Sequence, residues 1–600
     1  MLLRIKQLKI GTYGIFAFLI IALSSVLRIV LIAWGWPHSN ADVDTLGIMA
    51  MHIAFKGEHP IFFYGQNYMG TLQAYLAVAF FHLFSISVFS LRLGTVLLFS
   101  LFLVIMYFLT SLLYTKKLAL ITLVLLSLGS SIMLYTEIAG LAGYLELIFF
   151  GSLLLFLATW LALSYDQYTS PNRRLWRSIA YGCWGLAAGL GFWSDFLMFA
   201  YILVSGLLLV LFCWRELLQF AVLPLVLGLI IGLFPLIIYN LHAPTGQNTL
   251  NVLSSLHYAG SVELSKIQAH NLIPLEPELQ GTMLISLPAA TGGIPYCYDT
   301  NLMLTGYLSF HQVPCEVLQN NLSSVFIALV WSMGFIVLWT ISIVLTIKNL
   351  WKIRIKTSRH IGTQEVHQAI KLQFARLMLL SSSGLILLLF ILSPTSAVFP
   401  DNSRYLVGVL ISTPALIAPL LGLSSDKSAL TPNTSNGDHS HTHSWFTFTS
   451  FKVALGRGLL LIIGIVWLIG TINTFLEIPA VQANNKQQDK LLHGLLGIKA
   501  THIYTDYWTC DSIAFLSREQ IICAAVDARL HVQQHYSRYA PYVPIVEADP
   551  NSAYVFPIQA GQVATIDKRA ALSSGHYQRY VFGDYVVYQP VNTHNGTPPK

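Results

Sequence analysis

Two carboxylates, Asp42 and Asp44, open a polar stretch that follows the first long apolar run of the chain. The pattern after them predicts a short apolar helix, which stops at Gly57 and Pro60 as helices do. An aromatic and glycine-rich loop comes next, with Tyr64, Gln66, Asn67 and Tyr68. A carboxylate beside a polar pocket lined by rings can act as a general base. The same carboxylates could instead cap the helix that follows them.

The composition is that of a protein that crosses a membrane many times. Of the 600 residues, 55% are hydrophobic and 10% are charged, whereas a soluble protein has about 25% charged residues. The formal net charge of +7 is therefore interpreted by position, because Lys and Arg mark the cytoplasmic side of membrane proteins. The expected surrounding is a lipid bilayer, and no nucleic-acid partner is expected.

Span length and the positions of Lys and Arg predict about eleven transmembrane helices. Arg4, Lys6 and Lys9 place the N-terminus inside, and the first apolar run is too long for a signal peptide, so it is predicted to be a retained anchor. The apolar run 71–84 is too short to cross and is expected on the outer face. The predicted spans are 10–36, 88–114, 118–135, 144–163, 179–193, 196–214, 219–239, 321–347, 377–392, 405–423 and 458–475.

An odd number of spans places the C-terminal part of the chain outside. Residues 1–477 are predicted to form the membrane domain, with a first outer loop at 37–87 and a long outer loop at 240–320 that is expected to cover the active face. Residues 478–600 are predicted to form an extracytoplasmic α/β domain, because strand-like runs such as H-I-Y-T-D-Y-W alternate there with helix-like ones. The predicted fold class is an α-helical polytopic membrane protein with a small C-terminal α/β domain on the outer side.

Four of the six cysteines fall as pairs in two of the predicted outer segments. Cys297 with Cys315, and Cys510 with Cys523, are predicted to form disulfides, because an oxidising compartment permits them. Cys183 and Cys213 fall within predicted spans, where lone cysteines are usually packing residues.

Six short motifs lie in the first outer loop or near the ends of the predicted spans. They are D-V-D-T-L-G-I-M-A from Asp42, F-F-Y-G-Q-N-Y-M-G-T-L-Q-A-Y from Phe62, S-L-R-L from Ser90, G-Y-L-E from Gly143, G-F-W-S-D from Gly191 and S-R-Y-L from Ser403. Together they resemble the glycosyltransferase-C (GT-C) superfamily, which includes protein O-mannosyltransferases and the aminoarabinose transferases of lipid A. The similarity is to its family-39-like and family-83-like members. It covers residues 10–475 in organisation.

The resemblance implies that Asp42 is the general base of a sugar transfer. Many relatives carry a second acidic residue directly after that position, whereas this chain has Val43 there and Asp44 next. Arg404, in the R-Y motif, is implied as the partner of the donor phosphate, with Arg92 second; both arginines could instead snorkel at the membrane interface. The other residues implied in substrate binding are Asp44, Tyr64, Gln66, Tyr68, Glu146, Asp195 and Tyr405. No metal ligand is implied, although a divalent cation is a possible cofactor.

The expected function is that of an inverting hexosyl- or pentosyltransferase. It would move a sugar from a polyprenyl-phosphate-linked donor to a hydroxyl acceptor, which is a lipid, a glycan or a protein, while a carboxylate takes the acceptor's proton. The expected location is the bacterial plasma membrane, with the active site on the extracytoplasmic face. The alternative is a polytopic lipid or solute transporter or flippase, which would also show many spans and intramembrane charges. No internal repeat of the kind that many transporters carry is visible.

Overall fold

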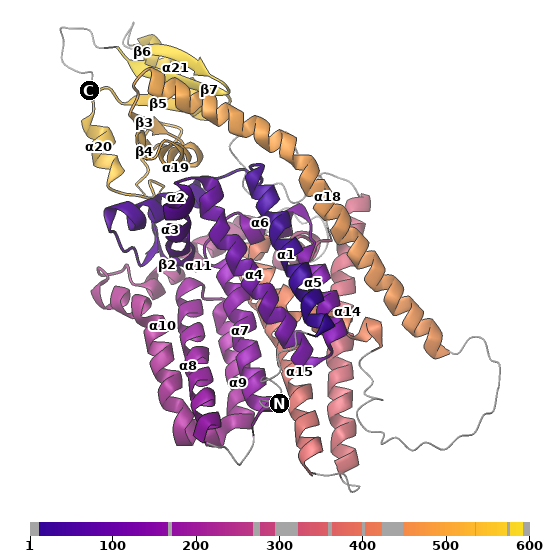
Figure 1. Cartoon of the computed structure of the whole chain (residues 1–600). Coiled ribbons are helices and arrows are strands. Elements are labelled where there is room, and N and C mark those ends of the chain that lie inside the picture. Colours follow the sequence, from indigo (N-terminus) through magenta and orange to yellow (C-terminus); the bar gives the residue numbers. More distant parts are fainter. Residues whose placement is uncertain are drawn as a thin grey trace.

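Figure 1 shows the computed structural model of the chain, in which a bundle of long helices carries a small α/β domain at one end. The structure describes residues 11–165, 171–267, 276–293, 322–357, 363–398, 402–422, 448–534, 536–572 and 577–591. The predicted fold class, a helical polytopic membrane protein with a small C-terminal α/β domain, is confirmed.

The long helices of the bundle are α1 (Thr12–Ala33), α4 (Val88–Leu113), α7 (Tyr144–Leu163), α8 (Pro171–Ser194), α9 (Met198–Glu216), α10 (Val222–His242), α14 (Leu322–Thr357), α15 (Thr363–Ile391) and α18 (Phe448–Gly497). Shorter elements complete it, namely α5 (Lys116–Ser127), α6 (Ser131–Ile138), η7 (Ser403–Ser412), α17 (Thr413–Ile417) and η8 (Pro419–Leu421). In the described ranges, 8 helices are long and apolar enough to cross a membrane, or 9 if the bent pair α5 and α6 is one span. Each predicted span overlaps a helix.

Helices α8, α9 and α10 run along the bundle three times, as the sequence predicts. Met198–His242 is continuously helical and counts as one of the eight, but it contains the π-helical turn η3 (Leu217–Ala221). Arg177, near the start of α8, binds Glu216 at the end of α9, so these two helices are antiparallel. The chain therefore reverses direction between α8 and α9.

Glycines let α8 and α10 approach closely. An added Cβ at Gly228 of α10 would lie 2.2 Å from the Gly182 carbonyl oxygen of α8, and one at Gly189 would lie 2.8 Å from Gly232. Such contacts exclude any side chain at these positions. The order of the paired glycines is the same in both helices, so α8 and α10 are parallel.

The predicted span at 118–135 is a bent pair of helices. α5 and α6 meet at an angle of 92°. The bend leaves backbone carbonyl groups of α5 without helical partners, and such groups need other donors inside a bundle. Arg28 of α1 reaches the carbonyl oxygens of Leu126 and Ser127 and also pairs with Glu137 of α6, with both charged side chains buried.

The predicted first outer loop is ordered beside the C-terminal domain. It contains α2 (Ala41–Met51), the π-helical turn η2 (His52–Lys56), the hairpin of β1 (Phe62–Phe63) and β2 (Gln66–Gly70), and α3 (Leu72–Phe84). The 13 residues of α3 are too few to cross, as predicted. The described parts of the predicted long outer loop contain α11 (Thr249–Ile267), α12 (Pro277–Gly281), η4 (Thr282–Ser286) and α13 (Leu287–Ala290), and α16 (Thr395–Val398) precedes η7.

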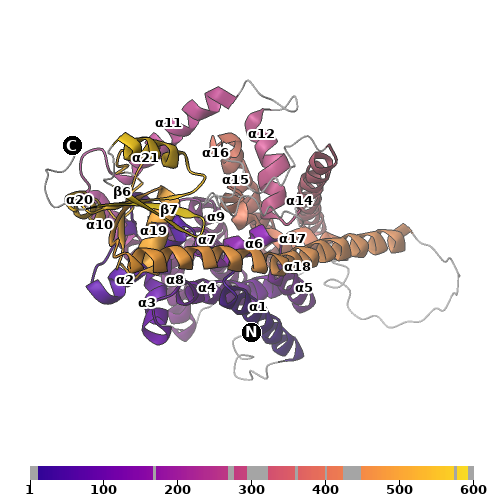
Figure 2. The same cartoon turned by 90° about the horizontal axis from the view of Figure 1, so that it is seen from above.

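Helix α18 joins the bundle to the C-terminal domain. It has 50 residues, and Figure 2 shows it extending along the bundle to the domain. The predicted last span, 458–475, lies within it, and the helix continues past residue 477 to Gly497. The predicted domain boundary therefore falls inside a helix, because the Ala-, Gln-, Lys- and Leu-rich sequence after the span favours helix.

The C-terminal domain is built on a five-stranded sheet of order β4-β3-β5-β7-β6. Its strands are β3 (His502–Thr505), β4 (Ile522–Ala525), β5 (Ala553–Pro557), β6 (Tyr577–Phe582) and β7 (Tyr585–Pro590). β3 is parallel to β4 and β5, and β7 is antiparallel to β5 and β6. The helices are α19 (Tyr507–Leu516), α20 (Tyr542–Ala548) and α21 (Gly561–Leu572). Helix α19 packs against α2, so it connects the domain to the first loop.

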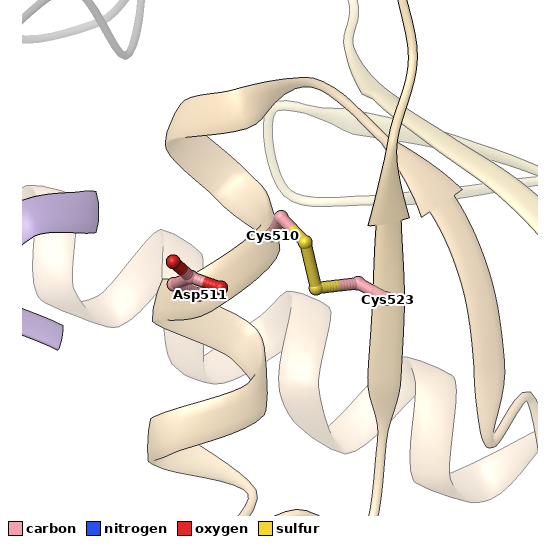
Figure 3. A group of neighbouring side chains, drawn as sticks. All are labelled: Cys510, Asp511 and Cys523. Atoms are coloured by element: carbon pink, nitrogen blue, oxygen red, sulfur yellow. A yellow bond between two sulfur atoms is a disulfide. The ribbon is translucent and has the colours of Figure 1, made fainter. Parts of the chain in front are cut away.

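The predicted disulfide between Cys510 and Cys523 is confirmed. It joins α19 to β4, as Figure 3 shows. Cys297 and Cys315 lie outside the described residues. Cys183 and Cys213 have free thiols, as the sequence predicts.

Candidate active site

Neither predicted carboxylate caps α2. The N-cap is Asn40, whose side-chain oxygen accepts a hydrogen bond from the Val43 backbone N–H at 3.0 Å. Asp42 and Asp44 lie in the first turn, two residues apart, and their side chains contact different groups. The capping interpretation of these carboxylates is therefore wrong, and both are available for other interactions.

The carboxylate of Asp42 meets two side chains of the C-terminal domain. Its Oδ1 atom accepts a hydrogen bond from the Tyr507 hydroxyl at 2.7 Å and one from Arg538 Nη2 at 3.1 Å. The Asp42 side chain is 27% exposed. Tyr507 is the first residue of α19, whose N-cap Asp506 accepts hydrogen bonds from two backbone N–H groups. The predicted base thus lies where the bundle and the C-terminal domain meet.

Gln66 of the first loop binds the same arginine. With its amide oxygen facing the guanidinium, Gln66 accepts hydrogen bonds from Arg538 Nη1 and Nη2, each at 3.0 Å. Gly65 precedes it with φ of +74°, a conformation that favours glycine. An added Cβ at Gly65 would lie 3.2 Å from Arg538 Cδ, so this glycine also gives the arginine room to approach.

Asp44 is buried between the first loop and α19. Its two oxygens accept hydrogen bonds from Ser39 and Ser512, both at 2.5 Å, and the neighbouring Thr45 donates to Asp511 of α19 at 2.5 Å. Burial raises the pKa of Asp44 to about 6 and that of Asp511 to about 7. These carboxyls join the domain to α2 and lie at 0% and 2% exposure.

Tyr64 belongs to a second cluster at the same interface. Its hydroxyl donates to Glu58 at 2.7 Å and lies 2.9 Å from His52 Nδ1, while His52 Nε2 lies 2.8 Å from Glu519 of the C-terminal domain. Burial alone would raise the pKa of Glu519, but hydrogen bonds from His52, Lys56 and Tyr542 lower it to about 2. Tyr64 therefore helps to hold the domain and does not contact Asp42.

Tyr68, Arg404 and Tyr405 gather on the bundle side of Asp42. Tyr68 is close enough to interact electrostatically with Asp42, Arg404, Tyr405 and Arg538, and burial raises its pKa to about 12. The Arg404 guanidinium carbon lies 5.2 Å from the centre of the Tyr144 ring and 6.0 Å from that of Tyr405. A guanidinium on aromatic faces is held in orientation, and its planar fork matches the geometry of a phosphate.

Arg92 is directed at the backbone. Its side chain is buried, with Nη1 donating to the Pro37 carbonyl at 2.6 Å and Nε to the Ala139 carbonyl at 3.2 Å. It therefore does not snorkel to an interface. It ties the start of the first loop to the end of α6.

Glu146 and Asp195 hold turns together. Glu146 Oε2 accepts hydrogen bonds from Gln73 of α3 at 2.6 Å and from the Gly143 N–H at 3.1 Å, so it caps α7. Asp195 lies between α8 and α9 and accepts a hydrogen bond from the Leu197 N–H at 2.8 Å. Both carboxyls bind a backbone N–H of their own turn, and Glu146 also joins α7 to α3.

Metal-ligand side chains come together at one place in the described parts of the chain, at Cys510, Asp511 and Cys523. The two cysteines form the disulfide, so their sulfur atoms are not thiolate ligands. Figure 3 shows Asp511 beside this disulfide on α19. A divalent cation at Asp42 would have to share that carboxylate with Arg538. No step of the reaction proposed below therefore passes through a cation.

Two residues of the candidate site, Tyr507 and Arg538, were not predicted from the sequence. Tyr507 is the second residue after β3, and side chains after parallel strands often form sites in α/β domains. That signal was present in the run H-I-Y-T-D-Y-W. Arg538 lies between β4 and α20 and has no motif around it, so only the folded structure brings it to Asp42.

The contact between α2 and α19 is expected to be more stable at acidic than at neutral pH. The raised pKa values of Asp44 and Asp511 mean that their contribution is complete below about pH 4 and is lost as the pH rises through 6 to 7. The lowered pKa of Glu519 acts in the opposite sense, because its contribution is present above about pH 4.5 and is lost as the pH falls toward 2. The sum is greatest at about pH 3.5 to 4 and falls as the pH rises toward 7, because two carboxyls with raised pKa values outweigh one with a lowered pKa.

Thermal unfolding of the full-length protein in detergent measures this dependence. A change in pKa from 3.8 to about 6 corresponds to roughly 3 kcal/mol, so the midpoint should be higher near pH 5.5 than near pH 8. Asp511→Asn should make the dependence shallower, because one of the two buried carboxyls no longer titrates. A midpoint that rises from pH 5.5 to pH 8 would contradict the interpretation.

Comparison with known proteins identifies the fold. No family model and no curated protein matches the chain. The crystal structure of ArnT from Cupriavidus metallidurans bound to undecaprenyl phosphate is similar over 97% of this chain and 99% of that one, at 14% identity and a TM-score of 0.52.

Two structures of the Archaeoglobus fulgidus oligosaccharyltransferase have lower TM-scores. The archaeal oligosaccharyltransferase AglB, in complex with an inhibitory peptide and a dolichol-phosphate, covers 96% of this chain and 74% of that one, at 13% identity and a TM-score of 0.44. The complex with Zn and sulfate covers 95% and 72%, at 12% identity and 0.45. The likeness to ArnT alone supports the fold, and it confirms the GT-C-like fold that the sequence motifs predict.

Proposed function

We propose that this chain is an inverting glycosyltransferase that uses a polyprenyl-phosphate-linked sugar. The observation that supports it best is the position of Asp42: a partly exposed carboxylate lies between the tyrosines and Arg404 of the bundle and the Tyr507–Arg538 pair of the C-terminal domain. The ArnT structure, whose TM-score to this chain is 0.52, was solved with undecaprenyl phosphate. A lipid-phosphate donor entering from the bundle side fits this arrangement.

In the proposed reaction Asp42 is the general base. As the acceptor hydroxyl oxygen attacks the anomeric carbon of the sugar, Asp42 Oδ2 takes the hydroxyl proton. The bond from the anomeric carbon to the phosphate oxygen breaks, and the polyprenyl phosphate leaves with the electron pair. Attack from the face opposite the leaving group inverts the anomeric configuration. A protein side chain with a positive charge, proposed below to be Arg404, stabilises the charge that develops on the phosphate.

Arg404 is the proposed partner of the donor phosphate. It lies on the aromatic rings of Tyr144 and Tyr405 and near Tyr68, all of which belong to the bundle or the first loop. Arg92, the second candidate, is occupied by the carbonyl groups of Pro37 and Ala139. Its proposed role is therefore structural.

The proposed orientation places the site on the extracytoplasmic face of a bacterial plasma membrane. The basic segments 348–376 and 173–177 then lie inside, as Lys and Arg usually do. The membrane domain would be residues 1–477 and the outer domain residues 478–600, with α18 continuing across this boundary. The outer loops at 37–87 and 240–320 would flank the site.

A transporter is the alternative from another class of protein. The bent pair α5 and α6 is the feature that would suit a transporter, because many transporters bind ions at broken helices. Here the carbonyl groups at the break bind Arg28, and Arg28 is neutralised by Glu137. The protein's own side chains therefore occupy the place that an ion would take.

Mass spectrometry of membranes with and without this protein tests the proposed function. Loss of the protein should leave a polyprenyl-phosphate sugar unconsumed and should remove one sugar from a surface lipid, glycan or protein. Unchanged lipid-linked sugars together with unchanged surface glycans would contradict it. The same transfer measured in isolated membranes with a metal chelator tests whether a divalent cation is a cofactor.

A further inference from the structure

We propose that the C-terminal domain completes the catalytic site, with Arg538 and Tyr507 as positioning residues for Asp42. This inference rests on the proposed function and adds a part of the chain to it. Both residues bind the same atom, Asp42 Oδ1, and so fix which oxygen is engaged. Oδ2 is then the oxygen that takes the acceptor proton.

The hydrogen bonds around Arg538 have a defined direction. Arg538 donates from Nε to the Tyr507 hydroxyl oxygen at 3.1 Å and from Nη2 to the same oxygen at 2.7 Å. A guanidinium can only donate, so the single hydroxyl proton of Tyr507 is directed to Asp42. The Gln66 amide oxygen accepts hydrogen bonds from Nη1 and Nη2 of the same guanidinium, each at 3.0 Å. The carboxylate, the phenol and the guanidinium thus hold one another in a single arrangement.

Burial makes this arrangement stronger than a surface ion pair. The Arg538 side chain is 12% exposed, and its guanidinium carbon lies 5.1 Å from the centre of the Tyr507 ring and 5.7 Å from that of Phe63. Bonds between a guanidinium and a carboxylate in such partly dry surroundings are stronger than neutral hydrogen bonds. Loss of the arginine would leave the Asp42 side chain free to rotate away from the acceptor.

Close packing of α2 against α19 fixes the distance between the two parts. An added Cβ at Gly47 would lie 2.5 Å from the ring of Phe515, so only glycine permits the observed approach. Hydrogen bonds from Ser512 to Asp44 and from Thr45 to Asp511 hold the same two helices together. Asp42 lies five residues before Gly47 on α2, and Tyr507 and Phe515 lie near the two ends of α19. The position of Asp42 and the hydrogen bonds to its carboxylate therefore both depend on the docked C-terminal domain.

The test measures sugar transfer by the full-length Arg538→Ala variant. The membranes come from a strain that lacks its own copy of the protein, and transfer is measured on the glycan that the wild-type protein modifies. We expect the rate to fall roughly 10- to 100-fold, the range for loss of a charged hydrogen-bond partner. Guanidinium chloride at about 10 mM should restore part of it, because the ion can enter the vacated space. Rescue is a readout that a purely structural role would not give.

Matched variants separate the outcomes. Arg579→Ala removes an arginine that also lies on a tyrosine ring of the C-terminal domain, at 5.9 Å from Tyr588, and should transfer as the wild type does. Gly47→Val should lower transfer without rescue by guanidinium. Transfer by Arg538→Ala above half of the wild-type rate, or a loss that guanidinium does not repair, would overturn the inference. An inactive wild-type protein would instead refute the proposed function.

Discussion

Replacing Asp42 by asparagine is expected to lower sugar transfer by a factor of roughly 10² to 10⁴ while leaving the fold intact. The amide has nearly the same shape and keeps an oxygen that Tyr507 and Arg538 can bind, but it cannot take a proton. Helix α2 does not lose its cap, because Asn40 provides it. The loss would therefore report the chemistry of the base.

The measurement is the initial rate of transfer in membranes, with the amount of folded protein determined by size-exclusion chromatography. Asp549→Asn is a matched control, because Asp549 is also a quarter exposed and paired, with His502, but lies in the C-terminal domain away from Asp42. It should keep the wild-type rate. A rate for Asp42→Asn close to that of Asp549→Asn would remove Asp42 from the mechanism.

Replacing Arg404 by alanine is expected to weaken binding of the lipid phosphate roughly 10- to 100-fold, because a charge-assisted hydrogen bond to the phosphate is lost. The aromatic rings beneath the guanidinium, Tyr144 and Tyr405, stay in place to fill the site. Binding of undecaprenyl phosphate to the purified protein in detergent measures the effect directly, without the sugar or the acceptor.

Two arginine variants make this result specific. Arg404→Lys should retain intermediate affinity, because a point charge replaces the planar fork. Arg92→Lys should lower the thermal midpoint, because hydrogen bonds to Pro37 and Ala139 are weakened, and should change the affinity for undecaprenyl phosphate little. Equal affinity of Arg404→Ala and the wild type would disprove the phosphate role of Arg404.

Much of the architecture follows from local patterns that do not depend on distant contacts. Apolar length located the spans and distinguished them from α3, which is too short to cross, and the alternating strand and helix patterns located the C-terminal domain. The pair Cys510 and Cys523 is close in sequence, with a separation of 13, and was predicted correctly. The acidic stretch at Asp42 was identified by its position after the first span.

Other features depend on partners that are remote in the sequence. The bend between α5 and α6 is supported by Arg28, about a hundred residues earlier, and apolar length alone cannot reveal it. Arg92 and Glu146 looked functional as charges near span ends, but Arg92 binds backbone carbonyl groups, and Glu146 binds a backbone N–H and the Gln73 side chain. Arg538 is nearly five hundred residues from Asp42, so no local pattern connects them.

The stereochemistry of the transferred sugar tests the central claim most directly. Full-length protein in liposomes would be supplied with the lipid-linked sugar and the acceptor found by mass spectrometry, and NMR would give the anomeric configuration of the product. We predict the opposite configuration to that of the donor, equal amounts of product and free polyprenyl phosphate, and no product with Asp42→Asn. A product with the donor's configuration, or one that Asp42→Asn forms at the wild-type rate, would contradict the account.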